Sequence, residues 1–232
     1  MEKFIVHSAG GVTLIGNGDV TPELLANSLT IAPVLVAADG GADAALRYGY
    51  QPVAVIGDLD SVTAAAQATI PADRLHRLEE QDTTDFDKCL RSIAAPFILA
   101  VGFAGARIDH ALAVFNALVR HPERRCIVLG GTDLCFLAPL TIDLDLPPGT
   151  RLSLFPMGPV RGTSQGLRWR IDGIGFAPDG RSGTSNETVA AAVRLRFDAA
   201  RMLVILPVEH LGAAIAAVTG GPHPGRSAVP DV

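Results

Sequence analysis

The segment GDLDS at residues 57–61 carries the residue types of phosphate chemistry at an informative spacing. Asp58 and Asp60 flank a single residue, and in extended backbone such side chains point to the same side. Carboxylates this close repel each other unless a cation or a proton joins them, and one or two carboxylates plus phosphate oxygens are typical Mg²⁺ ligands. The pattern predicts a Mg²⁺ site beside a phosphate-bearing substrate. The alternative is that Asp60 or Ser61 caps the following helix.

A second cluster, DGG at residues 39–41, follows the apolar run 34–38. Gly40 and Gly41 would let backbone N–H groups approach an anion near the start of a helix, with Asp39 beside them. The alternative is a tight turn in which Asp39 serves as an N-cap.

The third cluster, DTTD at residues 82–85, precedes an apolar pattern of helical spacing. Asp82 as N-cap and Asp85 in the first turn would complement the helix dipole. The same placement would also offer Asp85 to a metal ion. Thr84 and Lys88, which lies one turn after Asp85, are expected to contact the nucleotide.

The fourth cluster follows the glycines of GFAG at 102–105 and contains Arg107, Asp109 and His110. The guanidinium of Arg107 is suited to two phosphate oxygens at once, and Asp109 can orient it. The alternative is an exposed ion pair of little energetic value. We interpret His110 as structural and Trp169 as a core residue or a wall of the C-terminal domain.

These clusters require a sheet edge that gathers them. Short apolar runs alternate with helical patterns up to residue 131, which predicts a parallel sheet with both faces covered. The expected strands are 4–6, 12–15, 34–38, 53–56, 74–78, 96–101 and 126–129, and the expected helices are 22–29, 42–48, 62–69, a helix from about 83, and 107–120. Open α/β sheets bind ligands at the carboxyl edge, where these clusters fall.

Beyond residue 131 helical patterns nearly vanish, and short runs alternate with Gly/Pro turns. This predicts an antiparallel β domain over 132–219, after a catalytic domain over 1–131, with a flexible tail over 220–232. The expected strands are 134–137, 141–144, 151–155, 167–171, 189–197 and 202–205. The stretches 158–164 and 173–187 are expected to be connections that carry binding contacts.

The composition narrows the function class. The 232 residues are 48% hydrophobic and 19% charged, which is typical of a packed globular protein, and the formal net charge of −5 argues against a nucleic-acid binder. Three cysteines without paired spacing, Cys89, Cys126 and Cys135, favour free thiols in a reducing compartment. We recognise neither a signal peptide nor a membrane-spanning run, and we expect a cytoplasmic protein with no membrane partner.

The ordered set of motifs resembles the thiamine pyrophosphokinase family. The matching pieces are ADGGAD at 38–43, GDLDS at 57–61, QDTTDFDKCL at 81–90, GFAGARIDHALAVFNAL at 102–118, GLRW at 166–169 and GTSNE at 183–187. The resemblance implies a Rossmann-like α/β nucleotide-binding domain followed by a thiamine-binding β-sandwich. It also implies a homodimer with thiamine held across its interface. The implied reaction transfers the diphosphate of ATP to the hydroxyl of thiamine, giving thiamine diphosphate and AMP.

The resemblance also implies roles for individual residues. Mg²⁺ would be held by Asp58, Asp60 and Asp85, with Asp85 as our choice for the group that accepts the hydroxyl proton. The nucleotide site would contain Asp39, Gly40, Gly41, Thr84, Lys88, Arg107 and Asp109, and thiamine would contact Gln81, Ser185 and Asn186. Some relatives have a Trp after the Ser-Asn pair, whereas Glu187 follows here. The alternatives are a diphosphokinase for another primary alcohol, such as a hydroxymethyl pterin, and a non-catalytic nucleotide or thiamine sensor.

Overall fold

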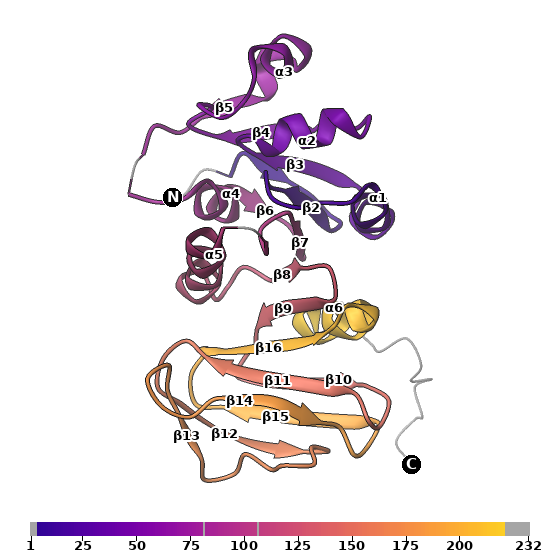
Figure 1. Ribbon diagram of the computed structural model, residues 1–232, viewed down its shortest axis with the longest axis vertical. Helices are drawn as coiled ribbons and strands as arrows, with labels where there is room; N and C mark the ends of the chain where they lie inside the picture. Colours follow the sequence, from indigo (N-terminus) through magenta and orange to yellow (C-terminus); the bar gives the residue numbers. More distant parts are fainter. Residues whose placement is uncertain (1–3, 81, 106, 221–232) are drawn as a thin grey trace. The chain divides into compact units, whose positions relative to one another are not determined.

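The computed structural model describes residues 4–80, 82–105 and 107–220. The chain forms two compact units, Met1–Gly131 and Thr132–Val232 (Figure 1). None of the helices within the described ranges combines the length and the apolar character that a membrane crossing requires.

The first unit contains a parallel sheet with the strand order β8-β7-β2-β3-β4-β5. The strands are β2 Val12–Ile15, β3 Val34–Ala38, β4 Ala54–Gly57, β5 Leu75–Arg77, β7 Ile98–Val101 and β8 Cys126–Leu129. Every residue of β2, β4, β7 and β8 is buried, as expected for a parallel sheet covered on both faces.

The strand order places a topological switch at β2. The chain runs from β2 through β3, β4 and β5 on one side, then returns to place β7 and β8 on the other side. Ile15 at the end of β2 is in register with Ala37 of β3 and Val101 of β7. A crevice outside the carboxyl ends of the strands is expected at such a point, and it is where open α/β sheets bind ligands.

Helices of the first unit connect these strands. They are α1 Pro22–Ile31, α2 Gly41–Arg47, α3 Ala64–Thr69, α4 Asp85–Ser92 and α5 Ile108–Arg120, with the 3-10 turn η1 Ala72–Arg74. Thr21 is the N-cap of α1, because its side chain accepts the Leu24 N–H. Outside the main sheet, β1 Val6–His7 pairs in parallel with β6 Ile93–Ala94.

Two predicted helix caps are wrong. Thr84, rather than Asp82, is the N-cap of α4, because its hydroxyl accepts the Asp87 N–H at 3.4 Å. Thr63, rather than Ser61, caps α3. The Ser61 hydroxyl instead donates to Asp60 Oδ1 at 2.9 Å, which removes it from the helix start.

The second unit has two antiparallel sheets, with the orders β14-β11-β16-β9 and β10-β15-β12-β13. The strands are β9 Asp133–Leu137, β10 Thr141–Asp145, β11 Arg151–Pro156, β12 Val160–Gln165, β13 Gly175–Phe176, β14 Gly183–Glu187, β15 Ala192–Phe197 and β16 Met202–Pro207. Alternate residues of β10 and β15 are buried, so each of these strands contributes one apolar face to the core.

Three predictions for this unit are wrong. Residues 167–171 form no strand apart from a single bridge between Leu167 and Thr188, and the stretches expected to be connections contain β12, β13 and β14. The third is the near absence of helices beyond residue 131, because a turn η2 Val208–His210 and a helix α6 Leu211–Thr219 follow β16. The sequence of α6 is largely alanine and apolar throughout, so it lacks the one-sided pattern on which helix prediction depends.

Candidate active site

A cavity of about 380 Å³ lies at the carboxyl edge of the parallel sheet in the first unit. Its lining comes from the segments that follow β2, β3, β4 and β7 and from the first turns of α4 and α5. The polar side chains that face it include Asn17, Asp19, Asp39, Asp85, Arg107 and His110. The cavity therefore occupies the crevice expected from the strand order.

Glycines bring the backbone segments of this edge into contact. The Gly18 N–H donates to the Gly102 carbonyl at 3.0 Å, and a Cβ added at Gly18 would lie 2.5 Å from that oxygen. A Cβ at Gly41 would lie 2.2 Å from the Ile15 carbonyl oxygen. Gly40 lines the cavity, as predicted for a nucleotide-site residue, whereas Gly41 instead allows α2 to pack closely against β2.

Three carboxylates gather where β3 and β4 end. Asp39, Asp58 and Asp60 each offer an oxygen within 4.8 Å of the others. The positions follow from the register, because Ala38 pairs with Ile56 and the two strands therefore end side by side. Asp39 adopts φ 43° and Leu59 adopts φ 65°, a left-handed conformation that residues other than glycine rarely take.

Asp39 is the most buried of the three carboxylates, with 5% of its surface exposed. Its Oδ2 accepts the Ser61 N–H at 3.2 Å. Its buried Oδ1 has no hydrogen-bond partner among the described residues. Burial raises the pKa of Asp39, and the nearby charge of Asp85 acts in the same direction. An unsatisfied buried oxygen within a set of oxygen donors fits a hard divalent cation such as Mg²⁺.

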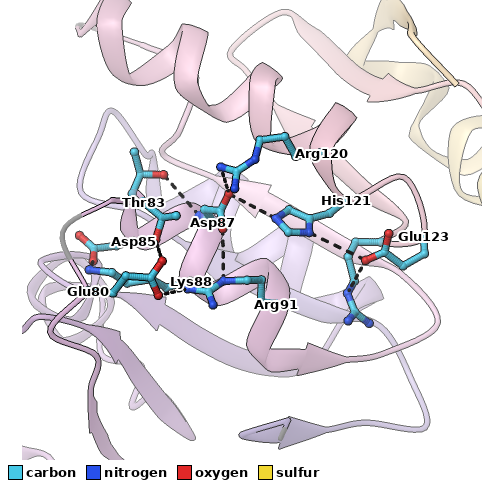
Figure 2. Close-up of polar contacts among 11 residues, drawn as sticks. Glu80, Thr83, Asp85, Asp87, Lys88, Arg91, Arg120, His121 and Glu123 are labelled. Carbon is cyan, nitrogen blue, oxygen red and sulfur yellow. Dashed lines mark hydrogen bonds and ion pairs between the residues drawn. The ribbon is translucent and has the colours of Figure 1, made fainter. Parts of the chain in front are cut away.

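Asp85 lies beside this group but is not one of its three members. Its Oδ1 is 3.0 Å from Nζ of Lys88, and a Cβ at Gly57 would lie 3.1 Å from that oxygen (Figure 2). Lys88 is 2% exposed, so its ammonium pairs with Asp85 and does not extend into the open cavity. Among the described residues, Asp39 thus takes the place in the carboxylate group that we had expected for Asp85.

Arg107 and Asp109 form an ion pair at the start of α5. Arg107 Nη2 is 2.7 Å from Asp109 Oδ2, and both side chains are 67% exposed. This hydrogen bond raises the pKa of Arg107 and lowers the pKa of Asp109. Because an exposed pair contributes little energy, the guanidinium stays available to an anion. His110, which we interpreted as structural, is exposed and lines the cavity.

The second unit holds the remaining predicted residues, apart from Gln81, which lies outside the described residues. Ser185 is exposed, with φ 59°, and its N–H donates to the Ser153 hydroxyl at 2.9 Å. Asn186 is buried, and its amide binds the backbone of Trp169 in both directions, at 3.2 Å to the N–H and 2.7 Å to the carbonyl. Trp169 is 57% exposed, so its interpretation as a core residue is wrong.

Comparisons with known proteins agree with this arrangement. Residues 25–129 match the family model described as the thiamin pyrophosphokinase catalytic domain. Residues 140–202 match the model described as the thiamin pyrophosphokinase vitamin B1 binding domain. The two matches follow each other in the order of the two units and together cover most of the chain. The chain belongs to the thiamin pyrophosphokinase family.

Several individual thiamine pyrophosphokinases are similar to this chain in sequence or in fold. Thiamine pyrophosphokinase 1 of Oryza sativa subsp. japonica is 29% identical over 66% of this chain and 65% of its own length. Thiamine pyrophosphokinase 1 of Arabidopsis thaliana is 27% identical over 74% of this chain and 71% of its own length. The chain thus spans slightly less than two thirds of the rice protein. The fold resembles that of thiamin pyrophosphokinase from Candida albicans, with TM-score 0.72 at 16% identity over 87% of this chain and 92% of that one.

The structure of this thiamin pyrophosphokinase family member adds roles that the sequence did not indicate. Asp39, which we expected only in the nucleotide site, joins the carboxylate group, while Asp19 and His110 line the cavity. The signal for Asp39 was available, because it directly follows a predicted strand beside the strand that leads to Asp58. The Asp19 side chain sits in a polar loop after β2 whose place at the cavity depends on contact with Gly102.

Proposed function

We propose that this protein transfers the diphosphate of ATP to the hydroxyl group of thiamine, producing thiamine diphosphate and AMP in a Mg²⁺-dependent reaction. The observation that carries this proposal is the group formed by Asp39, Asp58 and Asp60 at the sheet edge, in which Asp39 lines the cavity and its buried Oδ1 has no hydrogen-bond partner among the described residues. Diphosphate transfer depends mainly on positioning and on neutralising charge, and this site offers the residues for both.

Asp39, Asp58 and Asp60 would hold the Mg²⁺ ion, which when bound neutralises charge on the phosphate chain. The exposed guanidinium of Arg107 binds phosphate oxygens at the mouth of the cavity, and Asp109 orients it. Glycines 16 and 18 let the loop after β2 pack against Gly102, which places Asn17 and Asp19 at the cavity.

Asp85 is the group that accepts the proton of the thiamine hydroxyl. Its Oδ1 is engaged by Lys88 at 3.0 Å, which fixes the rotation of the carboxylate and leaves Oδ2 for the incoming hydroxyl. Lys88 therefore assists from a buried position, and Thr84 holds the turn in place as the N-cap of α4. This division assigns metal binding and proton transfer to different carboxylates.

Thiamine would be bound across the dimer interface, with Gln81 on one side and residues of the second unit on the other. Ser185 offers an exposed hydroxyl, and the ring of Trp169 offers an exposed aromatic face that a positively charged thiazolium can stack on. Asn186 acts indirectly, because its amide is committed to the Trp169 backbone. Homodimeric assembly, which follows from the family resemblance, and a cytoplasmic location, which is favoured by three cysteines without paired spacing, complete the proposal.

The deciding experiment incubates purified protein with thiamine, ATP and Mg²⁺ and separates the products by chromatography. We expect thiamine diphosphate and AMP in equal amounts, and no product in the presence of EDTA. ADP with thiamine monophosphate would contradict diphosphate transfer. Bound thiamine without any product would indicate a sensor, and product formed only from another alcohol, such as a hydroxymethyl pterin, would change the substrate.

A further inference from the structure

A buried carboxylate on α4 lies outside the cavity lining and has two arginines and a histidine around it. Asp87 is 2% exposed. Its Oδ2 is 2.9 Å from Arg120 Nη1 and 3.2 Å from His121 Nε2, and its Oδ1 is 3.3 Å from Arg91 Nε. Figure 2 shows these three side chains converging on Asp87 from α4 and from the end of α5. A carboxylate this buried needs such partners, so Asp87 joins the two helices.

Arg91 also contacts a second carboxylate through another nitrogen of its guanidinium. Its Nη2 is 2.7 Å from Oε2 of Glu80, whose Oε1 accepts the Thr83 hydroxyl at 3.0 Å (Figure 2). The hydrogen bond from Arg91 is the main reason that the pKa of Glu80 is lowered. One side chain therefore ties the turn before α4 to the buried carboxylate inside it.

The turn and the first residues of α4 are also the part of the helix that faces the cavity. Thr84, Asp85 and Phe86 line it, and Thr84 is the N-cap. Asp85 lies at the cavity, whereas Asp87 contacts Arg120 of α5 and Arg91 on the next turn of α4. Helix ends fray easily, so a tether from the last turn back to the turn before the helix fixes the residues between them.

We propose that Arg91 is a positioning residue for the reaction. By bridging Glu80 and Asp87 it holds the turn before α4. Thr84 and Asp85 consequently keep their places at the cavity. This inference rests on the proposed function, because the geometry that it protects is the one assigned there to proton transfer.

The test compares Arg91→Gln with Arg77→Gln. Arg77 is a matched control because its partner, Glu79, adjoins Glu80, but their pair is exposed and 3.9 Å apart. Arg91→Gln should fold, since Asp87 keeps Arg120 and His121. We expect kcat for thiamine diphosphate formation to fall at least about tenfold, with KM for ATP changed by less than about twofold, because misplacing a reacting group lowers turnover. Arg77→Gln should match the wild type in both constants.

The double variant Glu80→Gln/Arg91→Gln separates a tether from two independent effects. If the bridge acts as a unit, the double variant has the same kcat as Arg91→Gln alone. A double variant whose kcat is lower than that of Arg91→Gln, by the factor that Glu80→Gln alone costs, would overturn the proposal. An Arg91→Gln enzyme that retains kcat within about twofold of the wild type would also overturn it. An equal loss in Arg77→Gln would do the same.

A second measurement keeps this inference separate from the proposed function. Hydrogen exchange at the backbone amides of Asp87 and Lys88 requires no turnover, so it remains informative if the wild type forms no thiamine diphosphate. These amides donate to the Thr84 hydroxyl at 3.4 Å and to the Thr84 carbonyl at 3.0 Å, so their protection depends on the place of Thr84. We expect Arg91→Gln to speed exchange at these two amides at least about tenfold while β2 and β3 stay protected. A uniform increase throughout the unit, or no change at these two amides, would show that Arg91 contributes only general stability or nothing at this turn.

Discussion

Replacing Asp39 by Asn separates metal binding from folding, because the change affects them in opposite directions. In the absence of Mg²⁺, Asp39 is a buried carboxylate near Asp58 and Asp60, and no described residue hydrogen-bonds to its Oδ1. Asn has nearly the same shape and keeps an acceptor for the Ser61 N–H. The variant should therefore be more stable than the wild type without metal and should respond less to Mg²⁺.

The magnitude follows from the separation of the carboxylates. Two unit charges 4.8 Å apart repel by about 1 kcal/mol at the dielectric constant of water and by about 3 kcal/mol at an effective value of 20. Asp60 is exposed and Asp58 half-buried, so solvent screening favours the lower part of this range. We expect the metal-free variant to gain about 1 to 2 kcal/mol in free energy of unfolding.

The pH dependence has a definite sign. Because the folded pKa of Asp39 is raised, the folded protein binds more protons than the unfolded chain between the ordinary carboxylate pKa and the raised one. The stability of the metal-free wild type should therefore fall as the pH rises through that window. Asp39→Asn cannot titrate, so the fall contributed by this group should be absent from the variant.

Thermal and denaturant unfolding with EDTA and with saturating Mg²⁺ measures all of these quantities. At about one hundred times Kd, Mg²⁺ should stabilise the wild type by about 2.7 kcal/mol and the variant far less. Asp43→Asn is the control, because Asp43 accepts the Thr63 N–H at 3.1 Å and also the Thr63 hydroxyl, so its removal should lower stability. A metal-free Asp39→Asn protein less stable than the wild type, with an unchanged Mg²⁺ response, would refute the reasoning.

Two further predictions test the scaffold. Asn186→Ala should lower the free energy of unfolding by about 1–3 kcal/mol, because the buried amide holds the backbone of Trp169. It should also lower the fluorescence anisotropy of Trp169, the single tryptophan, and unchanged anisotropy would contradict this role. Gly41→Ala should destabilise by at least about 2 kcal/mol, because the new Cβ would meet the Ile15 carbonyl oxygen at 2.2 Å. Gly212→Ala, in open space on α6, should instead stabilise by up to about 1 kcal/mol, and equal unfolding midpoints for the two glycine variants would argue against the close packing.

The features that could be predicted from the sequence are those that depend on residues close together along the chain. The spacing of Asp58 and Asp60 predicted that they would act together, although the left-handed conformation of Leu59, rather than extended backbone, brings them together. The apolar runs of the parallel sheet were long enough to predict its strands. Asp39 was recognised as a site residue but not as part of the carboxylate group. That step needs the knowledge that β3 and β4 are adjacent and in register, which is a tertiary property.

Polar strands and isolated charges were harder to predict. The strands β12 and β14 consist largely of Gly, Ser, Thr and Gln, which are typical of loops, and cross-strand pairing alone makes them strands. Asp87 resembles a surface residue of a helix start, because its partners Arg120 and His121 lie at the end of α5, more than thirty residues later. Partners this distant leave no local pattern.

Several costs of folding coincide at the ends of β3 and β4. Asp39 and Leu59 adopt positive φ, each costing about 1–2 kcal/mol relative to ordinary backbone. Asp39 adds an unsatisfied buried oxygen, and the three carboxylates repel one another. Strained backbone persists only where the surroundings impose it, and here the imposed geometry turns the side chains on either side of Leu59 toward Asp39. A structural role for these residues would be served better by ordinary backbone and neutral side chains. Only a ligand of opposite charge gains from the arrangement, and for that reason we expect metal affinity to depend on the conformation at Leu59 as well as on the carboxylates themselves.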